Sequence, residues 1–447
     1  MTGLPTQPPF ALRARILSPL ADGGQLDEID GLLEVDERGR IARAGRWPGT
    51  NPPPAVIDLR PIALLPGMVD LHAHLPQIPN AGLGSGLDVL SWLDRYIFPL
   101  ERAYDRSVAE RQAPAAWRAF AAAGTTTVVA YAALWEDSTD AAFAAAEAHG
   151  IRAVIGKVMM DRITYDAEIA PNEILETSLR QSDDLATRWH GRDYGRLRYA
   201  FTPRFAVSCS AEMLRDSAAL AARHGAYWQT HLSEDAGEID EVRRLFPGTR
   251  DYLEVYERAD ALGDRAILAH AIHLSTSEVA RLVASGSTVA HCPASNLFLS
   301  SGMMPLAAYR ADDMRVGLGS DVAAGPELSI FTVMRAGAVT QRVLELAGRA
   351  ERDDALTAAD WLRLGTLDAA RVLGQDHDIG SLEAGKEADL IAVDPRLTTP
   401  LPGDAPPIEA ADDVLSRLMF RPHPNMVRGA WVRGRLLAGP PGLDGIG

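Results

Sequence analysis

Two histidines separated by one residue end an apolar segment of sequence LLPGMVDLHAH. In an extended strand, side chains two residues apart lie on the same face. His72 and His74 would therefore present both imidazoles at the carboxyl end of the strand. Imidazoles placed in this way can bind one metal ion. Taken alone, the pair is also compatible with two histidines at the surface.

Four later apolar segments also end in a side chain that can bind a metal. The residues that end them are His231, His270, His291 and Asp321. In a parallel barrel the carboxyl ends of the strands gather at one face, where such barrels have their active sites. The pattern therefore predicts a metal centre. Cys292 would point away from His291 and is predicted as core. The histidines predicted to lie at the surface are His149, His190, His224, His273, His377 and His423.

The segments that carry these residues belong to an alternation of strands and helices. Eight short apolar segments are predicted as strands: 63–71, 127–134, 153–159, 198–202, 226–230, 266–269, 288–290 and 315–319. Helical patterns lie between them, for example at 211–224, 238–261, 276–284 and 328–346. This alternation predicts an α/β fold of the (β/α)8 TIM-barrel type. A doubly wound parallel sheet is the competing topology.

Both ends of the chain have a different pattern. Short strand-like pieces punctuated by Gly and Pro occupy residues 10–58, and similar pieces recur toward the C-terminus. We therefore expect a small β-sandwich domain built from residues 1–61 and 376–447, beside a metal-dependent barrel domain at 62–375. The Pro-rich stretch 400–407 is predicted as a loop.

The composition excludes several classes of protein. The 447 residues include 60 Asp and Glu against 44 Lys and Arg, which gives a net charge of −16. An acidic chain is poorly suited to nucleic-acid phosphates or an anionic membrane, so neither partner is expected. Hydrophobic residues make up 47% and charged residues 23%, which is typical of a folded protein. Two cysteines, and an N-terminal sequence without the features of a signal peptide, predict a cytoplasmic protein.

Some common motifs are absent. The segment from Gly380 to Glu387 resembles a phosphate-binding loop, but Glu387 occupies the position where Ser or Thr would bind Mg²⁺. The sequence contains no G-x-S-x-G, no H-E-x-x-H and no P-C-x-x-C. These absences exclude the corresponding hydrolases and the small zinc deaminases.

The remaining motifs resemble those of a known family. The segments PGMVDLHAHLPQ, GTTTVV, TPRF, QTHLSE, LAH, AHCPASNLFLSSG and GLGSD occur in this order and resemble the amidohydrolase superfamily. Within it the guanine deaminases are most similar, through LPQ, SWLDRYIFPLE, GKVMMD, TPRF and SNLFLSSG. The resemblance covers about residues 62–375 and the tail GSLEAGKEADLIAVD. It breaks at Asp235 (usually Asn), at Ala271 (usually Gly) and in the loop 322–329.

The resemblance implies specific roles. The implied ligands of one zinc ion per chain are His72, His74, His231 and Asp321. The implied catalytic residues are Glu234, His270 and Asp321. The residues implied to bind substrate are His74, Gln77, Arg204, Phe205, His231, Glu234 and Asp321. The implied partner is a free purine base, and we expect a homodimer.

These roles predict hydrolytic deamination of guanine to xanthine and ammonia by a zinc-activated hydroxide. Glu234 would transfer the proton, and Arg204 would meet the acceptors O6 and N7 of the base. Trp92 and Phe98 are predicted as helix core rather than as pocket wall.

Three alternatives remain at this stage. The first is deamination of a related heterocycle such as 8-oxoguanine, a pterin or a triazine. The second is a cyclic amidase with two metals bridged by a carboxylated lysine, for which Lys157 would be the candidate. The third is a barrel without activity, in which ligands have been lost, although no ligand is missing from this sequence. The sequence assigns no other role to Lys157 and none to the loop 322–329.

Overall fold

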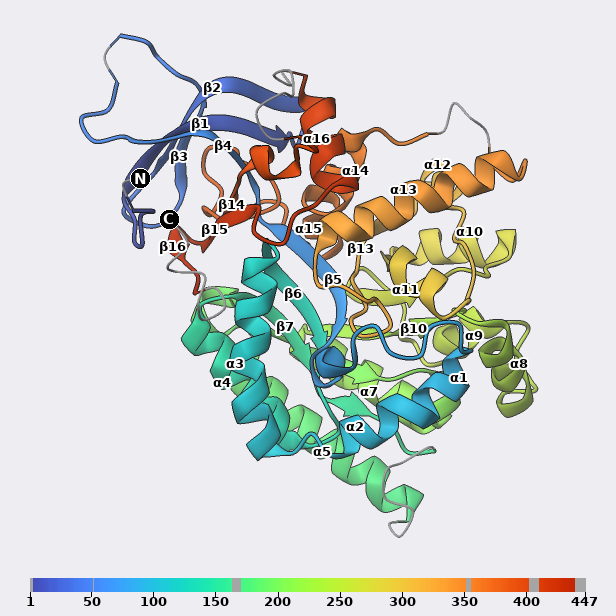
Figure 1. The fold of residues 1–447 in the computed structure, drawn as a ribbon. Helices are drawn as coiled ribbons and strands as arrows, with labels where there is room; N and C mark the ends of the chain where they lie inside the picture. The colour runs from blue at the N-terminus through green and yellow to red at the C-terminus, as the bar shows by residue number, and fades with distance from the viewer. Residues whose placement is uncertain (1–2, 51, 163–169, 351–354, 402–409, 439–447) are drawn as a thin grey trace.

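Eight parallel strands form a barrel in the computed structural model (Figure 1), which describes residues 3–50, 52–162, 170–350, 355–401 and 410–438. In spatial order they are β5 (Met68–His74), β6 (Thr125–Tyr131), β7 (Arg152–Gly156), β9 (Leu197–Pro203), β10 (Tyr227–Leu232), β11 (Ala266–His270), β12 (Thr288–His291) and β13 (Arg315–Leu318). The short strand β8 (Val158–Met159) also pairs with β9. Spatial order follows chain order, whereas a doubly wound sheet reverses its order at a switch point. The predicted barrel is therefore confirmed, and each predicted strand overlaps one of these strands.

The first and last strands of the barrel meet at their carboxyl ends. The backbone N–H of Asp321 donates to the carbonyl of His72 at 2.7 Å, and that of His74 donates to the carbonyl of Val322 at 3.0 Å. Gly319 lies so close to β5 that a Cβ there would be 2.8 Å from the Cβ of His72. The barrel thus closes directly beside the histidine pair.

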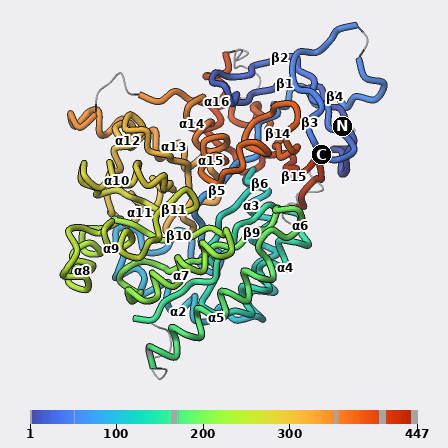
Figure 2. Tube along the Cα trace, turned by 180° about the vertical axis from the view of Figure 1, so that it is seen from behind, coloured from blue at the N-terminus to red at the C-terminus, as the bar shows by residue number. Residues whose placement is uncertain are grey.

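Helices cover the outside of the barrel, and Figure 2 shows α4, α5 and α7 from behind. The longer helices are α3 (Arg106–Ala122), α4 (Glu136–His149), α5 (Pro171–Trp189), α7 (Ala211–His224), α8 (Ala236–Leu245), α10 (Thr276–Ser285) and α13 (Ile330–Leu346). The shorter ones are α6 (Arg192–Gly195), α9 (Tyr252–Arg258), α11 (Pro293–Phe298), α12 (Leu306–Ala311), α14 (Ala358–Leu364) and α15 (Leu367–Val372). A short turn, η3 (Ala206–Ser208), precedes α7. Within the described ranges, no helix is both long enough and apolar enough to cross a membrane.

A run of short helices follows β5 and lies over the carboxyl end of the barrel. It consists of η1 (Leu75–Asn80), α1 (Val89–Trp92), η2 (Leu93–Ile97) and α2 (Phe98–Arg102). The α1 helix begins at Asp88, whose carboxylate accepts a hydrogen bond from the backbone N–H of Ser91 at 2.9 Å. This run is the first stretch of chain after the histidine pair.

One predicted helix was wrong. The pattern at 238–261 corresponds to two helices, because α8 ends at Leu245 and α9 begins at Tyr252. Pro247 and Gly248 lie between them, and neither favours continuation of a helix. Asp251 then caps α9 by accepting a hydrogen bond from the backbone N–H of Glu254 at 3.0 Å.

Strands from both ends of the chain form the second sheet, beside the barrel (Figures 1 and 2). Its order is β16 (Arg435–Leu436), β15 (Val427–Val432), β14 (Leu390–Val393), β4 (Ile57–Pro66), β1 (Phe10–Pro19), β2 (Gln25–Val35) and β3 (Ile41–Arg46). The expectation of a small β domain from both chain ends is confirmed. Within the described residues its strands form one mixed sheet rather than the two sheets of a sandwich, because β14 adds directly to β4. The turn η5 (Pro395–Thr398) and helix α16 (Ala411–Phe420) accompany it. Most of the stretch 400–407, predicted as a loop, lies outside the described residues.

The two sheets are joined at one glycine. The predicted strand 63–71 is divided, since its first part belongs to β4 in the small sheet and its second part to β5 in the barrel. Gly67 stands between them, and a Cβ there would lie 2.0 Å from Oγ1 of Thr126. The close contact of this backbone with β6 therefore requires glycine.

Apolar side chains from the barrel strands pack on α15, which closes one end of the barrel. This buried cluster includes Leu71, Val129, Ile267 and Cys292, together with Leu373 just after α15. The predicted core position of Cys292 is confirmed, because the side chain is fully buried. At the opposite end of the barrel the strands terminate in polar residues, and this is the end where barrels of this type have their active sites.

We predict that Gly319→Ala destabilises the barrel by about 1–3 kcal/mol, the usual cost of forcing a methyl group into a packed site. The added Cβ would collide with His72 and with the Sγ of Cys292 at 2.9 Å. Urea unfolding measures the free energy, and metal content should fall because His72 is displaced. Gly45→Ala is the matched control, since nothing lies within 4 Å of a Cβ at that position. Equal stability of the two variants would contradict the prediction.

Candidate functional site

Four ligand-type side chains converge where the barrel strands end. Each of His72, His74, His231 and Asp321 offers one atom, and these atoms all lie within 4.8 Å of one another. The Nε2 atoms of His72 and His74 are 3.3 Å apart, and they lie 3.2 Å and 3.3 Å from Oδ1 of Asp321. All four residues are buried. Three imidazoles and a carboxylate at this spacing form a donor set suited to one divalent metal ion.

Burial sets the charge of this group. It lowers the pKa of His72, that of His74 to about 4, and that of His231 well below its usual range. The three rings are therefore neutral near pH 7, which is the form that binds metals. Burial alone would raise the pKa of Asp321, but the neighbouring His72 and His74 hold it well below its usual range. The site therefore combines neutral imidazoles with an ionised carboxylate.

The orientation of His231 is fixed from behind. Its Nδ1 lies 2.6 Å from the carbonyl oxygen of Arg204, to which it donates when that nitrogen carries the proton. This contact leaves Nε2 as the nitrogen with a lone pair. The hydroxyl of Tyr256 donates to the carbonyl of His231 at 2.7 Å. The backbone that follows β9 thus holds the ring of His231, and a tyrosine on α9 holds its backbone.

A second cluster shares Asp321 and consists of Glu234, His270 and Asp321. The Nε2 of His270 lies 3.4 Å from Oε2 of Glu234 and 3.9 Å from Oδ2 of Asp321. The Nδ1 of His270 lies 2.9 Å from Oδ1 of Asn296. The hydroxyl of Ser295 donates to Oδ2 of Asp321 at 2.5 Å. Burial, together with the nearby charge of Asp321, raises the pKa of Glu234 well above its usual range. Glu234 is therefore able to hold a proton near neutral pH.

The backbone around this cluster adopts an unfavourable conformation. Ser233, His270, Ala271 and Asp321 have φ values of 46°, 73°, 50° and 49°. Residues other than glycine adopt this left-handed region at a cost, and such residues concentrate at functional sites. Ala271, named above as a departure from the resembled family, adopts this left-handed conformation without being glycine.

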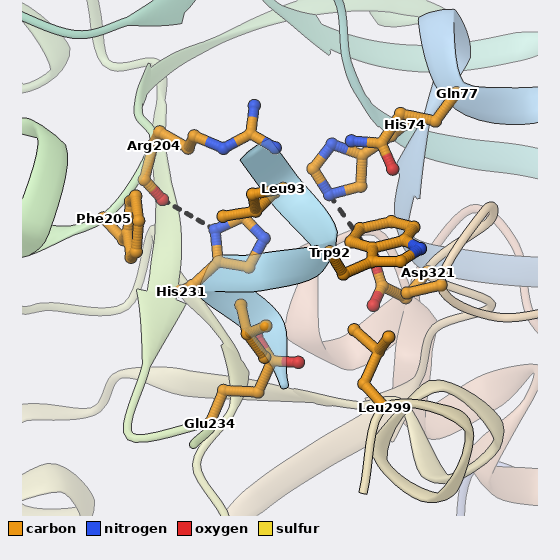
Figure 3. A pocket seen from close by; sticks show the side chains of 12 residues that line it. His74, Gln77, Trp92, Leu93, Arg204, Phe205, His231, Glu234, Leu299 and Asp321 are labelled. Atoms are coloured by element: carbon orange, nitrogen blue, oxygen red, sulfur yellow. Dashed lines mark hydrogen bonds and ion pairs between the residues drawn. The ribbon is translucent and has the colours of Figure 1, made fainter. Parts of the chain in front are cut away.

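A cavity opens onto the cluster. The residues that line it are His74, Gln77, Val89, Trp92, Leu93, Arg204, Phe205, His231, Glu234, Leu299, Asp321 and Ala324. In Figure 3, Arg204 and Gln77 lie on the side of the pocket away from Glu234 and Leu299. The predicted core position of Trp92 is confirmed, and its buried ring also forms part of the pocket wall, which the prediction did not include.

Glu101 connects two of the lining residues from outside the cavity. Its Oε1 accepts a hydrogen bond from Nε2 of Gln77 at 2.7 Å, and its Oε2 accepts one from Nη1 of Arg204 at 2.6 Å. Glu101 is fully buried on α2. The guanidinium of Arg204 also lies over the ring of Phe98, 5.5 Å from its centre. Sequence reasoning missed Glu101, although it ends the SWLDRYIFPLE segment.

Two other candidates from the sequence lie outside these clusters. His291 is buried, and neither ring nitrogen has a hydrogen-bond partner among the described residues. Lys157 is also buried, which lowers its pKa to about 7. Its Nζ donates to Ser178 on α5 at 3.0 Å and to the carbonyl of Val158 at 3.4 Å. The ammonium is thus directed toward the helix layer.

The sequence and fold of this chain resemble those of known hydrolases. Residues 63–437 match the model of the amidohydrolase family. A probable guanine deaminase of Deinococcus radiodurans is 36% identical over 415 residues, which cover 91% of this chain and 92% of that protein. The solved structure of Escherichia coli guanine deaminase is 32% identical and has a TM-score of 0.85, over 96% of this chain and 99% of that one. Guanine deaminase from C. acetobutylicum, solved with guanine bound in its active site, is 28% identical with a TM-score of 0.86 and the same coverage.

We predict one divalent ion per chain, bound by His72, His74, His231 and Asp321. Replacing any one of the three histidines by Ala should weaken metal binding by at least about 100-fold. Loss of a residue that only hydrogen-bonds to a metal ligand already lowers metal affinity by about 10- to 100-fold. Elemental analysis after dialysis gives the stoichiometry, and metal removal should lower the melting temperature. His377→Ala, an exposed histidine, is the control. A reproducible content of two ions per chain would refute the single-ion site.

Proposed function

This chain belongs to the amidohydrolase family, and on that basis we propose that it catalyses the hydrolytic deamination of guanine to xanthine and ammonia. One observation carries the proposal. A single cavity is lined on one hand by Glu234 and members of the ligand cluster, and on the other by Arg204, Gln77 and Phe205. The relatives described above, which match most of the chain, are a probable guanine deaminase and two solved guanine deaminases. A free purine base is therefore the proposed substrate.

The residues present fit a zinc ion. Three neutral imidazoles and one carboxylate match the ligands that zinc prefers, and the Nε2 atoms of His72 and His74 both face Oδ1 of Asp321. Zinc in such a site lowers the pKa of water toward about 7 and so supplies hydroxide at neutral pH. Lys157, directed toward α5, favours this arrangement over two metals bridged by a lysine.

Glu234 is the proposed proton carrier. Its carboxyl group lines the cavity beside His270, and the hydroxyl of Ser301 donates to its Oε1 at 3.3 Å. A carboxyl group with a raised pKa can accept a proton from the attacking water and deliver it to a ring nitrogen and then to the leaving amine. His270, held by Asn296, keeps a ring nitrogen facing both Glu234 and Asp321.

The rest of the cavity suits a flat, polar ring. Phe205, Trp92 and Leu299 supply apolar walls for the faces of the base. Arg204 supplies planar donors, which match the two acceptors O6 and N7 of guanine. Adenine carries an amino group at position 6 and would oppose donor to donor, leaving a buried mismatch.

We predict that Glu234→Gln lowers kcat by roughly two to four orders of magnitude while the metal stays bound, because the amide keeps the size but cannot carry the proton. Ammonia release and elemental analysis measure the two effects. Glu212→Gln, an exposed change of the same kind at the start of α7, should leave both unchanged. Normal turnover in the Glu234 variant would transfer the proton role to Asp321.

We predict that guanine exceeds adenine and cytosine by at least about a thousandfold in kcat/KM, since buried polar groups reject a mismatched partner strongly. Arg204→Lys keeps the charge opposite Glu101 but removes the planar pair of donors. It should lower kcat/KM for guanine by roughly 10- to 100-fold, the discrimination of one bidentate pair, with metal content unchanged. Faster turnover of 8-oxoguanine or a pterin than of guanine would move the assignment to that heterocycle.

A further inference from the structure

Glu101 is hydrogen-bonded to two side chains that line the pocket, and it fixes whether the Gln77 amide turns its oxygen or its NH2 group toward a bound base. The carboxylate is fully buried and uses one oxygen for each partner, Oε1 for Gln77 and Oε2 for Arg204. It is absent from the lining of the cavity, whereas both partners line it. Glu101 can therefore act on a bound base through these two side chains.

The orientation of the Gln77 amide follows from this contact. An ionised carboxylate only accepts hydrogen bonds, so the amide must turn its NH2 group toward Glu101. Its Oε1 is then the group left for another partner, and this buried oxygen has none among the described residues. A buried acceptor without a partner is costly, and a ligand that donates to it relieves that cost.

We propose that Glu101 is a specificity-determining positioning residue, which makes the pocket select bases with a ring N–H beside a carbonyl. Gln77 presents an acceptor for the N–H, and Arg204 presents donors for the adjacent carbonyl. Guanine has this pair at N1 and C6, whereas adenine has a bare nitrogen and an amine there. The inference rests on the proposed function for the identity of the base, and it deepens that proposal.

Replacing Glu101 by Gln should reverse which hydrogen-bonding group Gln77 presents to the base, rather than only weaken binding of the base. Arg204 only donates, so the new amide must turn its oxygen toward Arg204. Its NH2 group then faces Gln77, which must turn its own oxygen to accept. Gln77 would present its NH2 group to the base, and a bare ring nitrogen would become the better match.

Two bases that cannot be deaminated test this at equilibrium. Hypoxanthine carries the N1–H and the C6 carbonyl but no amine, and purine lacks all three. Calorimetry on the metal-loaded protein measures the dissociation constants of both bases. The wild type should bind hypoxanthine at least about tenfold more tightly than purine, and this affinity ratio is the quantity to compare. The ratio should fall by at least about tenfold in Glu101→Gln. Metal content and melting temperature show that each variant is folded and loaded.

The matched control is Glu278→Gln, another buried glutamate, which caps α10 and lies outside the cavity lining. It should leave the ratio unchanged. If Glu101→Gln does not fold, Glu101→Asp retains the charge but is too short to reach both partners, and the ratio should again fall.

The outcomes separate the two proposals. A wild type without preference for hypoxanthine, or a ratio that Glu101 variants do not change, overturns the inference, whether or not guanine is deaminated. A ratio that falls as expected in a protein that releases no ammonia from guanine supports the inference and overturns the proposed function. A purely structural role of Glu101 would weaken both bases equally and leave the ratio intact.

Discussion

The removal of ionisable groups from water is the constraint on which the rest of this site depends. Asp321 is buried at the end of the barrel among imidazoles that burial keeps neutral. A buried carboxylate needs a cation or hydrogen-bond donors to offset its lost hydration. A divalent ion at the centre of the cluster would satisfy this need for all four ligands. Burial and the nearby charge of Asp321 raise the pKa of the neighbouring Glu234, which therefore holds its proton more tightly.

The barrel places these groups through its backbone. Closure between β13 and β5 uses the carbonyl of His72 and the N–H of Asp321, so the hydrogen bond that completes the barrel also sets the distance between two ligands. Gly319 permits the approach, and left-handed turns at His270 and Asp321 direct the chain away beyond it. The conformational cost of those turns is balanced by the packing of the surrounding barrel.

Much of this could be predicted from sequence, because strand alternation and the common carboxyl end of parallel strands follow from local patterns. The histidine pair and the four later strand ends carry that signal. Glu101 could not be predicted, since it lies 24 residues from Gln77 and 103 from Arg204 and meets them only in the folded chain. The arrangement of the small domain as a single mixed sheet could not be predicted for the same reason, because β14 pairs with β4 across more than 300 residues. The break after α8 coincides with Pro247 and Gly248, whereas the pattern at 238–261 was predicted as one helix.

The closed lower end of the barrel has a consequence for turnover. The α15 segment fills that end, and the hydroxyl of Tyr227 donates to the carbonyl of Leu373 across it at 2.5 Å. Within the described residues, the cavity therefore communicates with solvent at the other end, beneath the short helices that follow β5. An incoming base and a departing purine product must then use one passage in turn. In the proposed reaction, xanthine that has not yet left would exclude the next guanine, and we therefore expect competitive product inhibition.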